Sequence, residues 1–205
     1  SSDLAILREF AAILNHEAAK HLERPFVHYV STNLPQKARD HFYGLREAKK
    51  DLVGLALFDK LEKTLQKANG LDEIMWTRRE IENYLCSKDA LMSYARYDQP
   101  VDDLFGHAEA NRREAAMKEA IEEISAAFQK LKRKEPWSPD VKATDEFLDP
   151  LFEEFFKKIG MENMLRKSDY HILASLIEPD KIDREVVEKL DAIVEVAKKA
   201  KPVKI

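Results

Sequence analysis

Apolar residues occur along this chain in two patterns, as short unbroken runs and as repeats at helical spacing. The longest unbroken run covers residues 52–58 (Leu-Val-Gly-Leu-Ala-Leu-Phe) and ends at Asp59. A continuous apolar run of this length is typical of a strand buried on both faces of a parallel sheet. Shorter runs at 74–77 (Ile-Met-Trp-Thr) and 26–30 (Phe-Val-His-Tyr-Val) predict two further strands.

Helical spacing of apolar residues predicts the other elements. In the first part of the chain we expect helices at 2–15, 16–22, 36–49 and 60–68. Helices and strands then alternate as in a small α/β fold with a parallel sheet and right-handed crossovers. An opening helix without a preceding strand is unusual in such a fold, which leaves room for a first strand upstream of Ser1.

From residue 79 onward the pattern is almost entirely helical. Helices are expected at 80–85, 89–96, 102–134, 146–159, 170–177 and 183–199. We therefore predict an α/β domain at 1–86 and a helical domain at 87–205.

Composition narrows the class of protein. Of the 205 residues, 44% are hydrophobic and 35% are charged, which fits a soluble globular protein rich in helix. No apolar run approaches the roughly 20 residues of a transmembrane helix, so we expect no membrane contact. The single cysteine, Cys86, excludes an internal disulfide and favours a reducing, cytoplasmic location. The net charge of −4 gives no general attraction to nucleic acid, so DNA contact would need local basic patches or bound metal.

Acidic residues follow two of the predicted strands. Asp59 comes directly after the strand at 52–58, and Glu80 and Glu82 follow the strand at 74–77. The carboxyl ends of parallel strands meet at one edge of a sheet, where α/β proteins place their ligands. Clustered carboxylates repel one another unless a cation holds them, which suggests a divalent-metal site. On a helix Glu80 and Glu82 would point about 200° apart, so at most one of them is expected to bind this ion.

Each candidate also has a purely structural interpretation. Asp59 precedes the predicted helix at 60–68 and could be its N-cap. Glu80 and Glu82 could lie on a solvated, charged turn. Asp3 opens the first helix, where an acid complements the helix dipole. Lys167 lies just before the helix at 170–177, and it could present a cation to phosphate or stay solvated.

Four segments carry a resemblance to a known family. They are residues 1–7 (Ser-Ser-Asp-Leu-Ala-Ile-Leu), 54–59 (Gly-Leu-Ala-Leu-Phe-Asp), 76–85 (Trp-Thr-Arg-Arg-Glu-Ile-Glu-Asn-Tyr-Leu) and 166–170 (Arg-Lys-Ser-Asp-Tyr). Together they resemble the TOPRIM-containing C-terminal nuclease region of the OLD (overcoming lysogenization defect) family. The resemblance implies a small, Rossmann-like TOPRIM core followed by a mainly helical extension. It also implies Mg²⁺- or Mn²⁺-dependent cutting of DNA, with an ATPase domain preceding this region in the same polypeptide.

The same resemblance gives roles to single residues. Asp3 looks like the trailing acid of the family's opening Glu-Gly-x-x-Asp motif, whose leading glutamate would lie upstream of Ser1. Asp59 looks like the first acid of its Asp-x-Asp motif, and Glu82 like the later glutamate ligand. Lys167 resembles the lysine that the helical region offers to the site.

Two further acids complete the set of candidate metal ligands. Leu61 stands where the family's second Asp is usual, so Glu62 is considered as its replacement. Glu80 is kept as a candidate beside Glu82.

The expected mechanism is hydrolysis assisted by two metal ions. Asp59, Glu82 and the upstream glutamate would hold two Mg²⁺ or Mn²⁺ ions ~3.5–4 Å apart. Lys167 would neutralise charge that develops on the scissile phosphate. ATP would be used only by the attached ATPase domain.

The sequence is also compatible with two other functions. A TOPRIM-like module with little or no activity could bind nucleic acid or a partner protein and regulate the ATPase. The helices at 102–200 could instead form an oligomerisation domain, with a homodimer as one outcome.

Overall fold

The computed structural model describes residues 2–23, 27–97, 99 and 104–201, and most of these residues are helical. In this part of the chain the sheet has two strands, β1 (Gly54–Phe58) and β2 (Leu71–Met75). They run parallel, in a register that pairs Gly54 with Leu71 and Phe58 with Met75. The predicted mixed α/β class with a small parallel sheet is therefore confirmed.

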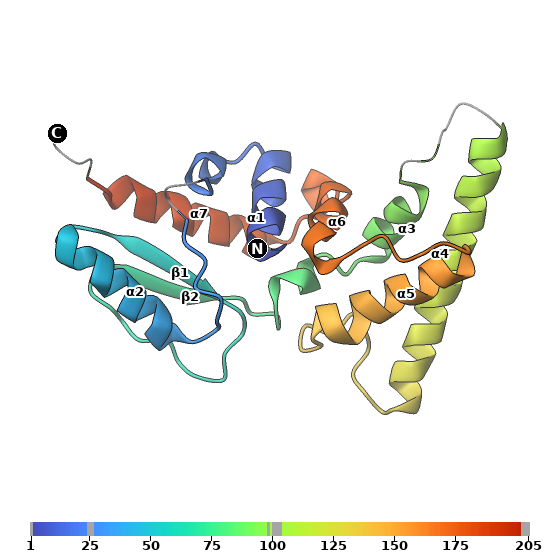
Figure 1. Ribbon diagram of the computed structural model, residues 1–205, viewed down its shortest axis with the longest axis horizontal. Coiled ribbons are helices and arrows are strands. Elements are labelled where there is room, and N and C mark those ends of the chain that lie inside the picture. Colours follow the sequence, from blue (N-terminus) through green and yellow to red (C-terminus); the bar gives the residue numbers. More distant parts are fainter. Residues whose placement is uncertain (1, 24–26, 98, 100–103, 202–205) are drawn as a thin grey trace.

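The described residues also form seven α-helices and several short helical turns, and α2 and α7 are the helices that lie against the sheet (Figure 1). The α-helices are α1 (Ser2–Ile13), α2 (Pro35–Ala48), α3 (Lys88–Arg96), α4 (Leu104–Lys130), α5 (Asp149–Lys158), α6 (His171–Ser175) and α7 (Arg184–Lys199). The 3₁₀ turns are η1 (Glu17–His21), η2 (Ile81–Tyr84), η4 (Lys167–Asp169) and η5 (Pro179–Lys181), and η3 (Ala143–Leu148) is a π-helical turn.

The ends of several helices follow directly from the sequence. α2 begins at Pro35, a residue whose fixed φ and missing N–H suit the first helical position. α3 follows Ser87, whose Oγ accepts a hydrogen bond from Ala90 N at 3.1 Å. α7 follows Asp183, whose Oδ1 accepts one from Glu185 N at 2.9 Å.

The two faces of the sheet are covered by helices from distant parts of the chain. Phe42 of α2 lies against Gly54, and α2 contacts both strands. Leu55 and Leu57 point to the other face, because neighbouring side chains on a strand alternate. They border a pocket together with residues of α7, so α7 lies across that face (Figure 1).

Two predicted elements are not found in the structure. Residues 60–68 contain bends but no helix, because α2 and α7 already cover the faces on which a crossover helix would pack. A helix this short is marginal unless tertiary contacts support it. Residues 27–30 have no regular structure and pass along the pocket, while Phe26 of the predicted strand lies outside the described residues.

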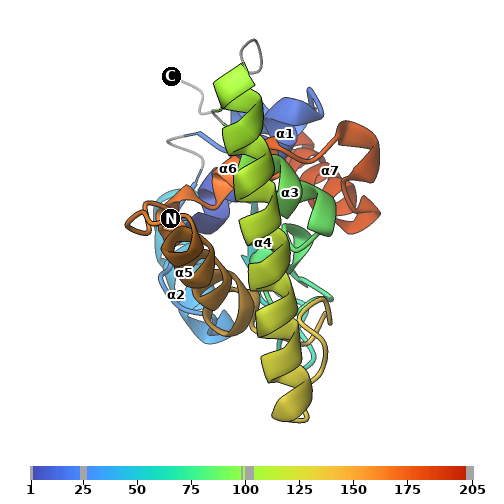
Figure 2. The same cartoon turned by 90° about the vertical axis from the view of Figure 1, so that its right-hand side faces the viewer.

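The buried core runs through both predicted domains. One continuous cluster includes Phe10 of α1, Trp76 after β2, Phe152 of α5 and Val194 of α7. α1 contacts α6, and α7 contacts β1, so the end of the chain returns to the α/β part. The boundary at residue 86 stays a prediction, and the parts on its two sides share this core. α4 stands apart from the sheet, packed on α3 and α5 (Figure 2).

Candidate functional site

The carboxyl end of β1 brings Asp59 next to the beginning of α1. Asp59 follows β1 directly, and its backbone N–H donates a hydrogen bond to Asn33 Oδ1 at 3.0 Å. Because no helix follows, Asp59 is not a helix N-cap. Asp59 and Asp3 both line a pocket of about 510 Å³. The fold therefore brings two of the predicted acids to one cavity, although they are 56 positions apart in sequence.

Glu80 and Glu82 contact different neighbours, because Glu80 is the extended N-cap of η2 and Glu82 lies within that turn. Glu80 is buried, and its Oε1 accepts a hydrogen bond from Thr144 N at 2.6 Å. The Glu80 backbone N–H donates to Asn83 Oδ1 at 2.9 Å, which forms the capping box of η2. Glu80 therefore connects η2 to η3 through the hydrogen bond from Thr144.

Glu82 turns instead toward η4. Its side chain is 2% exposed, and its Oε1 lies 3.2 Å from Lys167 Nζ. This buried oxygen receives no hydrogen bond from the described residues, so the ion pair with Lys167 is its main compensation. Lys167 is about half exposed, so its charge is also available to solvent and to a ligand.

Burial and the negative charges of neighbouring acids raise the pKa values of both Asp59 and Glu82. Burial, and then the negative charges of Asp3 and Glu80, raise the pKa of Asp59 to about 6. Burial, and then the charge of Glu80, raise the pKa of Glu82 to about 7, although Lys167 opposes this shift. Asp59 and Glu82 therefore share Asp3, Glu80 and Lys167 as charged neighbours.

The pKa of Lys167 is raised as well, which favours the charged form of this base. Burial alone would lower the pKa of its ammonium group. The charges of Glu82, Glu80 and Asp3 outweigh burial and raise that pKa. Lys167 therefore stays positively charged beside the acids.

The loop at 27–33 adds two residues that the sequence did not suggest. Tyr29 and Asn33 line the same pocket as Asp3 and Asp59. Burial raises the pKa of Tyr29, and the charges of Asp3, Asp59 and Glu82 raise it further. The residues around Asn33 signalled only a turn, because a loop that runs past a site leaves no periodic pattern.

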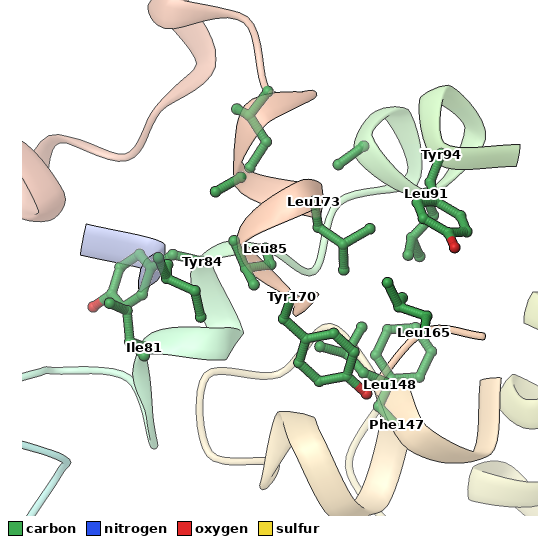
Figure 3. Packing of buried hydrophobic residues seen from close by; sticks show 14 of the residues in the cluster. Ile81, Tyr84, Leu85, Leu91, Tyr94, Phe147, Leu148, Leu165, Tyr170 and Leu173 are labelled. Atoms are coloured by element: carbon green, nitrogen blue, oxygen red, sulfur yellow. The ribbon is translucent and has the colours of Figure 1, made fainter. Parts of the chain in front are cut away.

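The segment between β2 and η2 is held by α7. Glu185 Oε1 accepts a hydrogen bond from Thr77 N at 2.9 Å, and Oε2 accepts from Thr77 Oγ1 and Tyr84 OH. Arg78 forms an ion pair with Asp183 and lies over the Tyr84 ring. Ile81, Tyr84 and Leu85 belong to the buried cluster, and Leu85 lies near Tyr170 and Leu173 (Figure 3). Glu82 therefore lies on a turn that hydrogen bonds and buried side chains hold in place.

Oxygen ligands of this kind fit Mg²⁺ or Mn²⁺ in their chemistry. Carboxylates are the ligands that these ions prefer, and Glu82 offers a buried oxygen with no hydrogen bond from the described residues. Within the described ranges, no three His, Cys, Asp or Glu side chains form a ready metal-binding group. Mg²⁺ commonly keeps several waters and uses only one or two protein carboxylates.

Glu62 is exposed in the segment between β1 and β2. Its charge is not among the main causes of the raised pKa values of Asp59 and Glu82. The proposal that it replaces the second acid of the Asp-x-Asp motif stays a prediction.

Comparisons of the chain with protein-family models, with curated proteins and with solved structures gave no match. Among the described helices, none combines the length and apolar character that crossing a bilayer requires. The resemblance to the OLD family therefore rests on the four sequence segments alone.

Proposed function

We propose that this chain is the nuclease part of a cytoplasmic, ATPase-linked enzyme and that it hydrolyses phosphodiester bonds in DNA with Mg²⁺ or Mn²⁺. The observation that carries the proposal is the pair of carboxyl groups at Asp59 and Glu82. Both have raised pKa values, and both share Lys167 as a neighbouring cation. Acids that repel one another in a partly buried site favour a divalent cation, because it stabilises their ionised forms.

In this mechanism the carboxylate oxygens of Asp59 and Glu82 would hold the metal. A bound Mg²⁺ or Mn²⁺ ion would supply an activated water and stabilise charge on the phosphate. Lys167 presents its ammonium group to a non-bridging phosphate oxygen. Asp3 adds negative charge at the rim of the pocket, and the Glu80 carboxylate keeps η2 in place through its hydrogen bond from Thr144. A second ion, as in the two-metal scheme, stays part of the prediction.

The ion pair between Glu82 and Lys167 also favours a second function. It partly compensates the buried charge of Glu82 without a metal ion. In that case the chain would be an inactive module that binds nucleic acid or a partner protein and regulates the attached ATPase.

Mn²⁺ binding and plasmid nicking together test these two functions. We expect the chain to bind Mn²⁺ in the millimolar range or tighter, as measured by electron paramagnetic resonance of free Mn²⁺. Asp59→Asn and Glu82→Gln should each weaken binding and slow nicking of supercoiled plasmid, by on the order of 100-fold. Glu188→Gln is the matched control, because Glu188 is an exposed acid of α7 paired with Arg184.

Different results separate the two functions. Nicking that survives in both Asp59→Asn and Glu82→Gln would exclude the proposed enzyme. A chain that binds no Mn²⁺ but still binds DNA or an ATPase partner would support the regulatory module.

A further inference from the structure

The pocket that contains Asp59 is much larger than a metal site needs. Its volume is about 510 Å³, and its walls come from β1, α1, α7 and the loop at 27–33. Protein interiors contain few spaces larger than a water molecule, whereas pockets for small molecules measure about 300–1,000 Å³. The proposed metal ion would use only the part of this space beside Asp59. The rest of the pocket has no role in the proposed nuclease.

Apolar side chains from four parts of the chain line this pocket. They include Leu7 of α1, Leu57 of β1, Trp76 after β2, and Ile193 and Val196 of α7. A ligand that covers these side chains is stabilised, because apolar surface is removed from water. The walls therefore suit a ligand with an apolar body.

Two aspartates give the pocket its charge. Asp3 and Asp59 line it, and no lysine or arginine is among its described lining residues. The negative charge of Asp3 helps to raise the pKa of Asp59, so the two carboxyl groups lie in the same part of the pocket. Lys167 also acts on Asp59, but it forms an ion pair with Glu82. An anionic group would be repelled by these two acids, and a cationic group would be attracted.

We propose that this pocket binds a small hydrophobic amine. Its ammonium group binds the carboxylates of Asp3 and Asp59, and its apolar body packs against Leu57, Trp76 and the side chains of α7. A hydrated metal ion would leave the apolar walls uncovered, and a neutral apolar molecule would leave the repulsion between the acids uncompensated. A hydrophobic amine meets both conditions. This binding does not depend on nuclease activity.

Three probes that share one apolar body test the proposal. They are 4-phenylbutylamine, 4-phenylbutanol and 4-phenylbutanoate, which end in an ammonium, a hydroxyl and a carboxylate group. Binding is followed by the fluorescence of Trp76 in the 205-residue chain carrying Trp137→Phe, which leaves Trp76 as the only tryptophan. The titrations are done in EDTA at pH 8, where Asp59 is ionised because its pKa is about 6.

We expect 4-phenylbutylamine to bind saturably and at least about 10-fold more tightly than 4-phenylbutanol, because the ammonium group forms charge-assisted hydrogen bonds. The carboxylate probe should bind more weakly than the alcohol. Asp3→Asn combined with Asp59→Asn should lower the affinity for the amine to that for the alcohol. The affinity for the alcohol should stay unchanged, which shows that the doubly substituted pocket is still folded.

Three single variants complete the test. Asp3→Asn alone should remove part of the preference for the amine, and it changes a local contact, since Asp3 accepts a hydrogen bond from Ser2 Oγ at 2.9 Å. Ala197→Phe places a larger side chain in the pocket from α7 and should weaken binding of the amine and the alcohol. Glu188→Gln removes an exposed acid of α7 that is paired with Arg184, and it should bind all probes as the unchanged chain does.

Three results would overturn the proposal. The first is the absence of saturable binding of the amine. The second is equal affinity for the amine and either of the other probes, because the acids would then not recognise the ligand. The third is unchanged amine binding in Ala197→Phe, which would place the ligand elsewhere. Because these titrations contain no free metal ion, a failure of Mn²⁺ binding or plasmid nicking would leave their results standing.

Discussion

The environment of Glu82 differs strongly from that of an ordinary surface acid, because its side chain is 2% exposed. Its pKa is raised to about 7 from 4.5 because its carboxyl group is buried beside Glu80. Between those values the folded, metal-free protein binds more protons than the unfolded chain. Its free energy of unfolding therefore falls as pH rises from about 4.5 to about 7, by at most about 3 kcal/mol from this group.

Urea unfolding in EDTA at pH 5 and at pH 8 measures this dependence. Glu82→Gln should remove most of the decrease and be the more stable protein at pH 8. Glu188→Gln, on the exposed side of α7, should keep the wild-type dependence. An unchanged pH dependence in Glu82→Gln would show that Glu82 ionises normally.

Lys167 provides the compensating charge. Lys167→Met should raise the pKa of Glu82 further, because the cation 3.2 Å from its Oε1 is lost. At pH 8 we expect a loss of about 1–2 kcal/mol of stability, reduced from that of a buried pair because Lys167 is half exposed. A carbon-13 titration of the Glu82 carboxyl group measures the pKa directly. An identical titration curve in Lys167→Met would contradict the ion pair.

At the scale of elements, hydrogen bonds from η2 and the segment before it to α7 help to hold η2 in place. Glu185 accepts hydrogen bonds from Thr77 and Tyr84, on either side of the turn that carries Glu82. Glu185→Gln should lower stability by about 1–3 kcal/mol, because it replaces a charged acceptor with a neutral amide. It should also weaken Mn²⁺ binding without touching the proposed ligands. Glu188→Gln, one turn further along α7, is the control, and equal Mn²⁺ affinity in the two variants would remove this positioning role.

The sequence predicted elements well where one pattern dominated. β1 was evident because residues 52–58 are apolar without interruption. β2 begins earlier than predicted, at Leu71, because the charged Asp72 and Glu73 hid its first residues. Glu73 is tolerated in the strand because Arg39 of α2 donates two hydrogen bonds to it. Such a pairing across 34 positions has no local signal.

The sequence also predicted part of the candidate site. The positions of the acids after predicted strands and the family resemblance together selected Asp3, Asp59 and Glu82. The charges of Asp3 and Glu80 raise the pKa values of both Asp59 and Glu82. The loop that places Tyr29 beside them could not be foreseen, because its path depends on the packing of α1 and α7. Roles in catalysis or metal binding stay predictions.

At the scale of the whole molecule, the last helix covers the sheet formed by the first third of the chain. Val186, Leu190 and Val194 of α7 are buried in the common core, and Lys189 of α7 lies over the ring of Trp76. Residues 1–86 alone would expose the apolar face of β1 and lose these contacts. Each buried side chain of this size contributes about 1.5–3 kcal/mol, which is large compared with the stability of a typical domain.

We therefore expect a fragment of residues 1–86 to lack a cooperative unfolding transition. Trp76, which is 3% exposed in the full chain, reports this change by its fluorescence. The comparison uses the 205-residue chain carrying Trp137→Phe, so that Trp76 is the only tryptophan in both proteins. Emission should shift to longer wavelength in the fragment and stay blue-shifted in the full chain. A fragment with blue-shifted emission and a sharp urea transition would instead establish 1–86 as an independent domain, with α7 as an added cover.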